Sequence, residues 1–382
     1  MTQIIFFVIF FSILGLISFY IYIRGLQSIP LNSSLRSPYT IIFWIVAFSF
    51  VGGRLFESVL PSAMTGFLDW VGSFWLGAMV YFLLAIVFLD VLRLVNYFVP
   101  FFPSLIKHNY AQSKHIISTG IIGMVGLLLL GGHINSLIPR IRKLDLPIAK
   151  TAGKIKSLNI VAVSDIHMGT IVGQSRVEYI VNRINSLNPD LVLLPGDIVD
   201  MDLTPVIRQN LGEALRNIKS RFGVYAATGN HEYIGGVDRA CRYLEDHNID
   251  VLRDQSIKIA DSFYLVGRED RSANGFGGHR RKDLAELIAN VDKVFPVILM
   301  DHQPSALREA SRQGIDLQIS GHTHDGQLWP INYIVESIYE LPWGYRRIAD
   351  THFYVSDGVG TWGPPIRIGN RPEIVQILLH FE

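Results

Sequence analysis

Four long stretches without a charged residue lie within the first 138 residues of this 382-residue chain. A helix needs about 20 predominantly apolar residues to cross the hydrocarbon core of a bilayer. Three of the stretches are long enough, and the second is a few residues short. A soluble core of this size does not need four such stretches in succession. We therefore predict an all-α transmembrane region in residues 1–140, with four helices at about 4–23, 38–58, 70–95 and 115–138.

The first stretch, Ile4–Ile23, could instead be a secretory signal peptide that is removed. A signal peptide begins with a basic segment and has an apolar core of about 7–15 residues. Met1–Gln3 contains no Lys or Arg, and the uncharged stretch is longer than that core. These features favour a retained membrane anchor and hence an integral, multi-pass membrane protein.

The basic residues near the predicted spans indicate an orientation. Four spans place both chain ends on one side of the membrane. Seven basic residues fall on that side, Arg54 and the cluster between Arg140 and Lys156, against five in the opposite loops. Because loops rich in Lys and Arg stay in the cytoplasm, this count favours a cytoplasmic location for the C-terminal part.

Charge divides the chain into two unlike parts. The first 150 residues contain 10 Lys or Arg and 4 Asp or Glu, whereas residues 151–382 contain 24 and 29. The second part is about 23% charged, which is ordinary for a soluble domain. The composition excludes a disordered chain, a collagen-like fibre and a disulfide scaffold, since Cys241 is the single cysteine. Neither part is basic enough to favour nucleic acid as a partner, and no obligate protein partner is indicated.

Short apolar runs rich in Val, Ile and Leu recur beyond residue 157, separated by turn residues and amphipathic stretches. Such runs are typical of strands that are buried on both faces. Their alternation with helical patterns predicts an α/β domain with two packed sheets at 156–382, joined to the membrane region by a linker at 141–155. The predicted strands are 158–163, 190–194, 223–227, 262–266, 296–300, 316–319, 352–355 and 374–379.

Five of these strands run directly into clusters of side chains that can bind metals. In open α/β sheets, sites form beyond the carboxyl ends of the strands, so loops far apart in sequence can converge there. The donors are oxygen and nitrogen atoms of Asp, His and Asn without a thiolate, which suits Mn, Fe or Zn better than Ca or Mg. The clusters are Asp165–His167, Gly196–Asp200, Gly229–Glu232, Asp301–His302 and Gly321–His324.

Spacing within the clusters supports convergence of the donors. Asp165 and His167 are two positions apart, and in an extended chain two such side chains point to one side. The same holds for His322 and His324. Each His or Asp motif of this kind is weak alone, but five in succession at predicted strand ends are not a chance pattern. An aspartate such as Asp197 can bridge two cations.

This series of motifs resembles the calcineurin-like metallophosphoesterase superfamily over residues 156–382. The resemblance implies a four-layer α/β/β/α sandwich and two divalent metal ions, with Mn expected and Fe or Zn as alternatives. His231 resembles the catalytic histidine of the family, and Asp200 resembles the carboxylate that orients it. By the same resemblance, one metal is bound by Asp165, His167, Asp197 and His324, and the second by Asp197, Asn230, His302 and His322.

The C-terminal tail is similar to a membrane-anchored branch of that family. The matching residues are Gly358–Thr361, Pro365–Arg367 and Pro372–Ile374. Some members of this branch hydrolyse lipid-linked diphosphates of the UDP-diacylglucosamine type. We therefore expect a membrane-anchored phosphohydrolase that acts at the bilayer on a phosphate ester or diphosphate, lipid-linked in this interpretation.

Two other functions are consistent with the pattern. The first is a phosphoprotein phosphatase or cyclic-nucleotide phosphodiesterase with a passive anchor. The second is a membrane receptor or transporter whose soluble domain senses a phosphate ligand. Charges deep inside the apolar stretches would favour a transporter, and the stretches contain none.

The segment Leu328–Trp343, directly after the last ligand motif, is unusually apolar. It has two interpretations, which are the packing of a buried cap and a lip that touches the bilayer or holds acyl chains.

Overall fold

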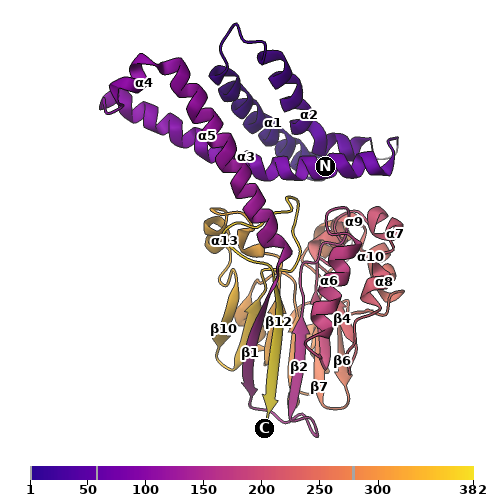
Figure 1. Ribbon diagram of the computed structural model, residues 1–382. Coiled ribbons are helices and arrows are strands. Elements are labelled where there is room, and N and C mark those ends of the chain that lie inside the picture. Colours follow the sequence, from indigo (N-terminus) through magenta and orange to yellow (C-terminus); the bar gives the residue numbers. More distant parts are fainter. Residues whose placement is uncertain (1, 57–58, 278–279) are drawn as a thin grey trace. The chain divides into compact units, whose positions relative to one another are not determined.

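A computed structural model describes residues 2–56, 59–277 and 280–382 of the chain (Figure 1). The chain divides into two compact units. The helical unit comprises residues 1–133 and 363–366, and the α/β unit comprises residues 134–362 and 367–382. The division therefore falls a few residues before the predicted end of the transmembrane region at residue 140.

A long helix lies over each of the four predicted spans, although α2 ends at Leu55 and α5 at Leu137, short of the predicted ends at 58 and 138. Among the described residues, three helices (α2, α3 and residues 110–136 of α5) are long and apolar enough to cross a membrane. A fourth span at α1 stays a prediction, and residues 57–58 of the predicted second span lie outside the described residues. The helices are α1 (Thr2–Ser28), α2 (Arg36–Leu55), α3 (Ser62–Phe98), the short α4 (Ser104–His108) and α5 (Tyr110–Leu137).

Helices α2 and α3 pack closely within the helical unit. A Cβ atom on Gly72 would lie 2.3 Å from the backbone nitrogen of Phe50, so only glycine permits this approach. Small residues at such crossings are typical of helix packing in membranes. On another face of α2, Ile41, Ile45 and Phe48 are exposed at helical spacing. A row of exposed apolar side chains is expected where a helix faces lipid.

The α/β unit contains two six-stranded mixed sheets. All eight predicted strands are present, each within two residues of its predicted ends. The first sheet has the order β1 (Arg140–Ile148), β12 (Glu373–Phe381), β2 (Ser157–Ala162), β3 (Leu191–Pro195), β4 (Val224–Ala227), β5 (Asp250–Val251). The second has the order β10 (Gly344–Ile348), β11 (Thr351–Val355), β9 (Leu317–Ser320), β8 (Val297–Met300), β7 (Phe263–Gly267), β6 (Gln255–Ile259).

Alternate strand residues enter different cores, and this establishes the layers of the unit. Ile160 of β2 packs between the two sheets, whereas its neighbour Val161 packs against the helices that cover the first sheet. Likewise, Ile298 of β8 lies between the sheets and Leu299 faces the helices on the second sheet. The layer order is therefore helix, sheet, sheet, helix, which agrees with the predicted α/β fold.

Short helices connect the strands. The first sheet is covered by α6 (Gln174–Asn185), α8 (Gly212–Leu215) and α10 (Val237–Glu245), and the second by α11 (Leu284–Leu287) and α12 (Leu307–Arg312). The others are α7 (Thr204–Arg208), α9 (Asn230–Gly235), the π-helix η1 (Ala273–Gly277), the 3-10 helix η2 (His324–Gly326) and α13 (Asn332–Ile338).

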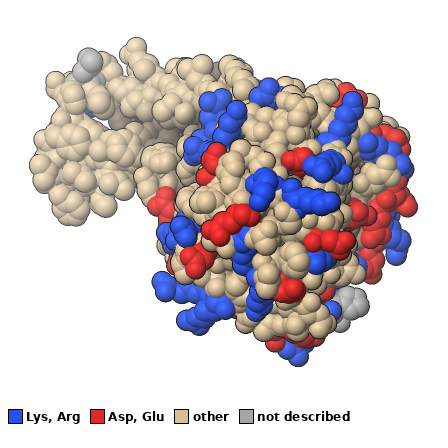
Figure 2. All heavy atoms as spheres, turned by 90° about the horizontal axis from the view of Figure 1, so that it is seen from below, with Lys and Arg blue, Asp and Glu red and all other residues tan. Residues whose placement is uncertain are grey.

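The surface of the α/β unit is charged, as its composition predicts. Figure 2 looks onto the end of the unit that carries the C terminus and shows Lys, Arg, Asp and Glu side chains spread across it. Lys154, Lys258, Asp261 and Lys293 are among the exposed residues of the unit.

The predicted linker at 141–155 is wrong over its first half. Residues 140–148 form β1, which pairs in parallel with β12 along its whole length. Leu146 and Ile148 are buried between the sheets. As an edge strand, β1 is partly exposed along its first half and carries several basic residues there. This half resembles a basic juxtamembrane segment in sequence, which is why it was not recognised as a strand.

We expect residues 134–382 to be markedly more stable than residues 150–382. The shorter fragment lacks β1, so the edge of β12 is unpaired and two buried aliphatic side chains are lost, worth about 3–6 kcal/mol. In a domain of this size such a loss lowers the Tm by roughly 10 °C or more. Thermal melts by circular dichroism and gel filtration measure the difference. Equal melting temperatures for two monomeric fragments would show that β1 does not belong to the folded unit.

Candidate metal centre

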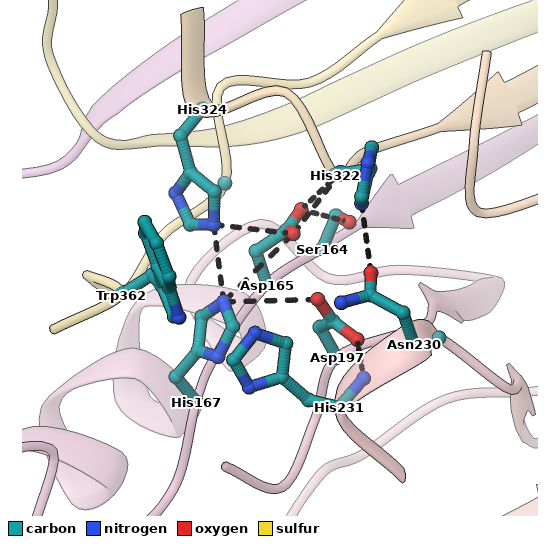
Figure 3. Close-up of polar contacts among 12 residues, drawn as sticks. Ser164, Asp165, His167, Asp197, Asn230, His231, His322, His324 and Trp362 are labelled. Atoms are coloured by element: carbon teal, nitrogen blue, oxygen red, sulfur yellow. Dashed lines mark hydrogen bonds and ion pairs between the residues drawn. The ribbon is translucent and has the colours of Figure 1, made fainter. Parts of the chain in front are cut away.

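Five strand ends converge at one place in the α/β unit. Loops that follow β2, β3 and β4 of the first sheet meet loops that follow β8 and β9 of the second (Figure 3). These are the five strands whose carboxyl ends carry the metal-competent motifs. The predicted site residues come together there: Asp165, His167, Asp197, Asp200, Asn230, His231, His302, His322 and His324.

One group of donors is formed by Asp165, His167 and His324. The Nε2 atoms of His167 and His324 lie 3.0 Å apart, and Asp165 Oδ1 lies 3.4 Å from His324 Nε2. All three side chains are buried. Three electron-pair donors thus face one small volume, the arrangement that a cation between them requires.

The second group is formed by Asp197, His302 and His322, with Asn230 beside them. His302 Nε2 lies 3.1 Å from Asp197 Oδ2 and 3.2 Å from Asn230 Oδ1. His322 Nδ1 lies 2.8 Å from the same amide oxygen of Asn230. The predicted second ligand set is therefore assembled in space.

Asp197 lies between the two groups. Its Oδ2 atom is 3.9 Å from His167 Nε2 on one side and 3.1 Å from His302 Nε2 on the other. A carboxylate that bridges two cations must lie close to ligands on both sides, and Asp197 lies close to His167 and His302. Its position is that of a residue able to bridge two cations.

The backbone reaches this geometry through left-handed turns and not through an extended chain. Asp165, His167, Asp197, His322 and His324 all have φ between 48° and 73°. Asp165 and His167 do face one donor group as predicted, but through these turns and not through an extended chain. The prediction is wrong for His322 and His324, which belong to different groups. Non-glycine residues in such conformations cost of order 1–3 kcal/mol each and cluster at functional sites, where the surrounding structure holds them.

Two glycines allow the loops to approach. Gly196 has φ +90°, and a Cβ atom there would lie 2.5 Å from His302 Nδ1. A Cβ atom on Gly229 would lie 2.2 Å from Asp197 Oδ1 and 2.4 Å from its backbone nitrogen. Both positions therefore require a residue without a side chain, as expected for glycines next to ligands.

Glu232 positions the Asp197 loop, a role that the sequence did not reveal. The carboxylate of Glu232 is buried and accepts hydrogen bonds from the backbone N–H groups of Asp197, Ile198, Val199 and Gly229, at 2.8–3.0 Å. It thus joins the turn after β3 to the turn after β4. Its place next to His231 is the one signal that could have pointed to it.

His231 and Asp200 form a pair at the edge of the centre. His231 Nδ1 lies 2.9 Å from Asp200 Oδ1. Burial alone would lower the pKa of His231, but the carboxylates of Asp197 and Asp200 raise it to about 9. Asp200 therefore orients the imidazole ring and favours its protonated form.

The tail and Asp301 have roles outside the donor groups. Arg367 is buried and donates hydrogen bonds to the carbonyl groups of Asp357 and Gly360, which fixes the tail loop that packs beneath Asp165. Asp301 accepts hydrogen bonds from Arg281 at 2.5 Å and Arg268 at 3.3 Å, although it directly precedes His302.

The donor set fits divalent cations. Burial lowers the pKa of His167 to about 3 and that of His322 to about 4, so these imidazoles keep the lone pairs that metals need. Burial also raises the pKa of Asp165 to about 6, because the carboxylate lacks sufficient compensating positive charge. Burial alone would lower the pKa of His302, but the carboxylate of Asp197 raises it well above the usual value, so a cation at this position would have to displace a proton. Imidazoles, carboxylates and an amide oxygen without a thiolate form a typical site for Mn, Fe or Zn.

Residues 158–326 match the family model described as calcineurin-like phosphoesterase. An uncharacterized metallophosphoesterase of Aquifex aeolicus is 31% identical over 256 residues, covering 66% of this chain and 97% of that protein. A bovine "transmembrane protein with metallophosphoesterase domain" is 33% identical over 279 residues, covering 69% of this chain and 61% of that protein. Its zebrafish counterpart is 32% identical over 277 residues, with the same coverage.

The chain thus spans about three fifths of the length of these two vertebrate relatives. Among solved structures, a 5'-nucleotidase precursor from Thermus thermophilus aligns with a TM-score of 0.37 and 12% identity, covering 59% of this chain and 54% of that one. This likeness is too low to add to the sequence matches.

Gly229→Ala is expected to remove bound metal from the purified full chain. The new Cβ atom would overlap the carboxylate of Asp197, which lies between the two donor groups. We expect the metal content to fall by at least about ten-fold, the order seen when the surroundings of a ligand are disturbed. Elemental analysis after dialysis measures it. Gly275→Ala is the matched control, because nothing lies within 4 Å of its Cβ position. Equal metal content in both variants would contradict the prediction.

Proposed function

Since this chain belongs to the calcineurin-like phosphoesterase family, we propose that it is a membrane-anchored, metal-dependent hydrolase of phosphoester or diphosphate bonds. The observation that carries this proposal is the position of Asp197 Oδ2 between His167 and His302. A carboxylate that lies between two groups of metal-competent donors matches the arrangement of a dinuclear hydrolytic centre.

The ligand assignment follows the two donor groups. Asp165, His167, Asp197 and His324 would hold one ion, and Asp197, Asn230, His302 and His322 would hold the other. Two divalent ions, Mn in our proposal, would neutralise phosphate oxygens and supply a nucleophile from water at neutral pH.

His231 would act on the leaving group of the substrate. It lies beside the first donor group, with its ring centroid 4.5 Å from that of His167. Asp200 holds Nδ1, so Nε2 is left to donate a proton to the leaving oxygen. We propose a catalytic role for His231 and a positioning role for Asp200.

A lipid-linked phosphate ester or diphosphate is the substrate class that we propose. The described part of the chain has three helices long and apolar enough to span a bilayer, and two of its relatives are named as transmembrane proteins. An anchored enzyme encounters lipid head groups at high local concentration. The excess of basic residues on the side of the α/β unit favours the cytoplasmic face.

With Mn²⁺, the full chain in detergent or vesicles is expected to hydrolyse a lipid diphosphate faster than a phosphopeptide or a cyclic nucleotide. Phosphate release measures each rate. Asp197→Ala is expected to abolish turnover and to lose metal as well, because in our assignment this carboxylate is a ligand of both ions. A metal-loaded chain that cleaves no phosphoester would refute the proposed activity, whereas a preference for a soluble ester would refute only the lipid substrate.

His231→Asn is expected to separate catalysis from metal binding. The ring of His231 is not part of either ligand group in our assignment, so elemental analysis should find both metals retained. The rate should fall by about 10²–10⁴-fold, the usual contribution of a positioned acid. An unchanged rate would exclude His231 as the proton donor, and loss of metal would make it a ligand instead.

A further inference from the structure

The apolar segment Leu328–Trp343 divides into a buried part and an exposed part. Leu328 and Leu341 are buried. Trp343 packs under the guanidinium groups of Arg140 and Arg142 and donates a hydrogen bond to Glu373, so it belongs to the framework. These residues confirm the interpretation as cap packing for the ends of the segment.

The middle of the segment is not covered. None of the residues of α13, all of which are described, is buried. Large exposed side chains of α13, together with one Trp before the helix and one in the tail, form a surface that we call the apolar rim: Trp329, Tyr333, Ile334, Ile338 and Trp362. Isolated exposed apolar residues are ordinary, but a group with two Trp and one Tyr is typical of a surface that meets a membrane interface.

The apolar rim borders the metal centre. The ring of Trp362 lies 6.3 Å from that of His231, centroid to centroid, and Figure 3 shows Trp362 beside His167. Tyr339, directly after α13, lies 6.0 Å from the ring of His322. The Gln327 side chain donates to the carbonyl of Trp362 and accepts from its N–H, at 2.9 Å each. It thus connects Trp362 to the segment that begins at Leu328.

The chain also enters the α/β unit at the end that carries the metal centre. Arg140 at the start of β1 pairs with Glu373, and β12 runs antiparallel to β2, whose end leads into Asp165. Only Ile138 and Pro139 separate α5, a candidate membrane helix, from β1.

Hydrogen bonds connect this entry point to the ligand loop. The Asn135 side chain at the end of α5 donates to the carbonyl of Asn370 at 2.7 Å, and the Asn370 side chain donates to the carbonyl of His324 at 2.9 Å. The opposite end of the unit is the charged face of Figure 2. The apolar rim, the point where the chain enters and the metal centre therefore lie at the same end of the α/β unit.

We propose that the apolar rim inserts into a lipid surface, so that the metal centre opens directly against the bilayer interface. Its Trp and Tyr side chains suit the headgroup level, and Ile334 and Ile338 suit the acyl region below it. A substrate with its phosphate at the headgroup level would then reach the site without leaving the membrane. This inference extends the proposed function but also stands on the position of the rim alone.

A fluorescent label at position 338 tests the contact without reference to activity. Ile338→Cys in the full chain is labelled with an environment-sensitive dye, NBD, and reconstituted in vesicles of phosphatidylcholine and phosphatidylglycerol. Cys241 is buried and does not compete for the dye. Val294→Cys is the matched control, since Val294 and Ile338 are both 66% exposed and Val294 precedes β8 at the opposite end.

Lipids that carry a doxyl quencher are expected to reduce the emission at position 338 roughly two-fold or more and to leave position 294 unchanged, as for a segment seated in the interface. Equal quenching at both positions would overturn the proposal. So would energy transfer between labelled copies without lipid quenching, since the rim would then bind a second copy of the chain.

A second measurement connects the apolar rim to turnover. The double variant Ile334→Ser, Ile338→Ser is expected to lower the ratio of long-chain lipid diphosphate hydrolysis to soluble bis(p-nitrophenyl) phosphate hydrolysis by about ten-fold. Val294→Ser should leave this ratio unchanged. If the wild-type chain cleaves neither substrate, the proposed function fails, while the quenching result still decides the lipid contact.

Discussion

The carboxylate of Asp197 is the group on which the candidate centre depends. It lies in the α/β unit with little exposure, within the second donor group and 3.9 Å from His167 of the first. A buried carboxylate is costly unless positive charge and hydrogen bonds compensate for it. The backbone N–H of His231 donates to Oδ1 of Asp197 at 2.9 Å. Burial alone would raise the pKa of Asp197, but the nearby imidazole of His302 keeps this pKa well below the usual range. The carboxylate of Asp197 is therefore held in its charged form, in which it can bind a cation.

The left-handed turns explain how so many donors converge. One of these turns also exposes a backbone N–H that orients a ligand from another loop. The N–H of His322, for example, donates to the carboxylate of Asp165 at 3.0 Å. The turn that carries His322 thus holds Asp165 in place, and the buried strands beneath hold the turns. At about 1–3 kcal/mol for each of the five residues, the strained conformations cost roughly 5–15 kcal/mol, which several buried aliphatic side chains are needed to offset.

The candidate site was predictable because the motifs follow strands that are buried on both faces. Those strands appear in sequence as apolar runs, and the polar residues after them stand out. The strands that were not predicted, β1, β5, β6 and β10, are short or lie toward sheet edges. β10, for example, contains Arg346 and Arg347, which are both exposed. Glu232 was not recognised because its role depends on four backbone groups from two loops, which no spacing in the sequence encodes.

The direction of β1 connects membrane attachment to the chemistry of the site. A strand that pairs in parallel with β12, which is antiparallel to β2, must begin where β2 ends. Because β2 ends just before Asp165, the position of the first residues after α5 follows from sheet pairing alone. Pairing in the opposite direction would bring the chain in at the charged end, far from the ligands. An edge strand that the sequence did not reveal is therefore the one that determines which end of the α/β unit is attached.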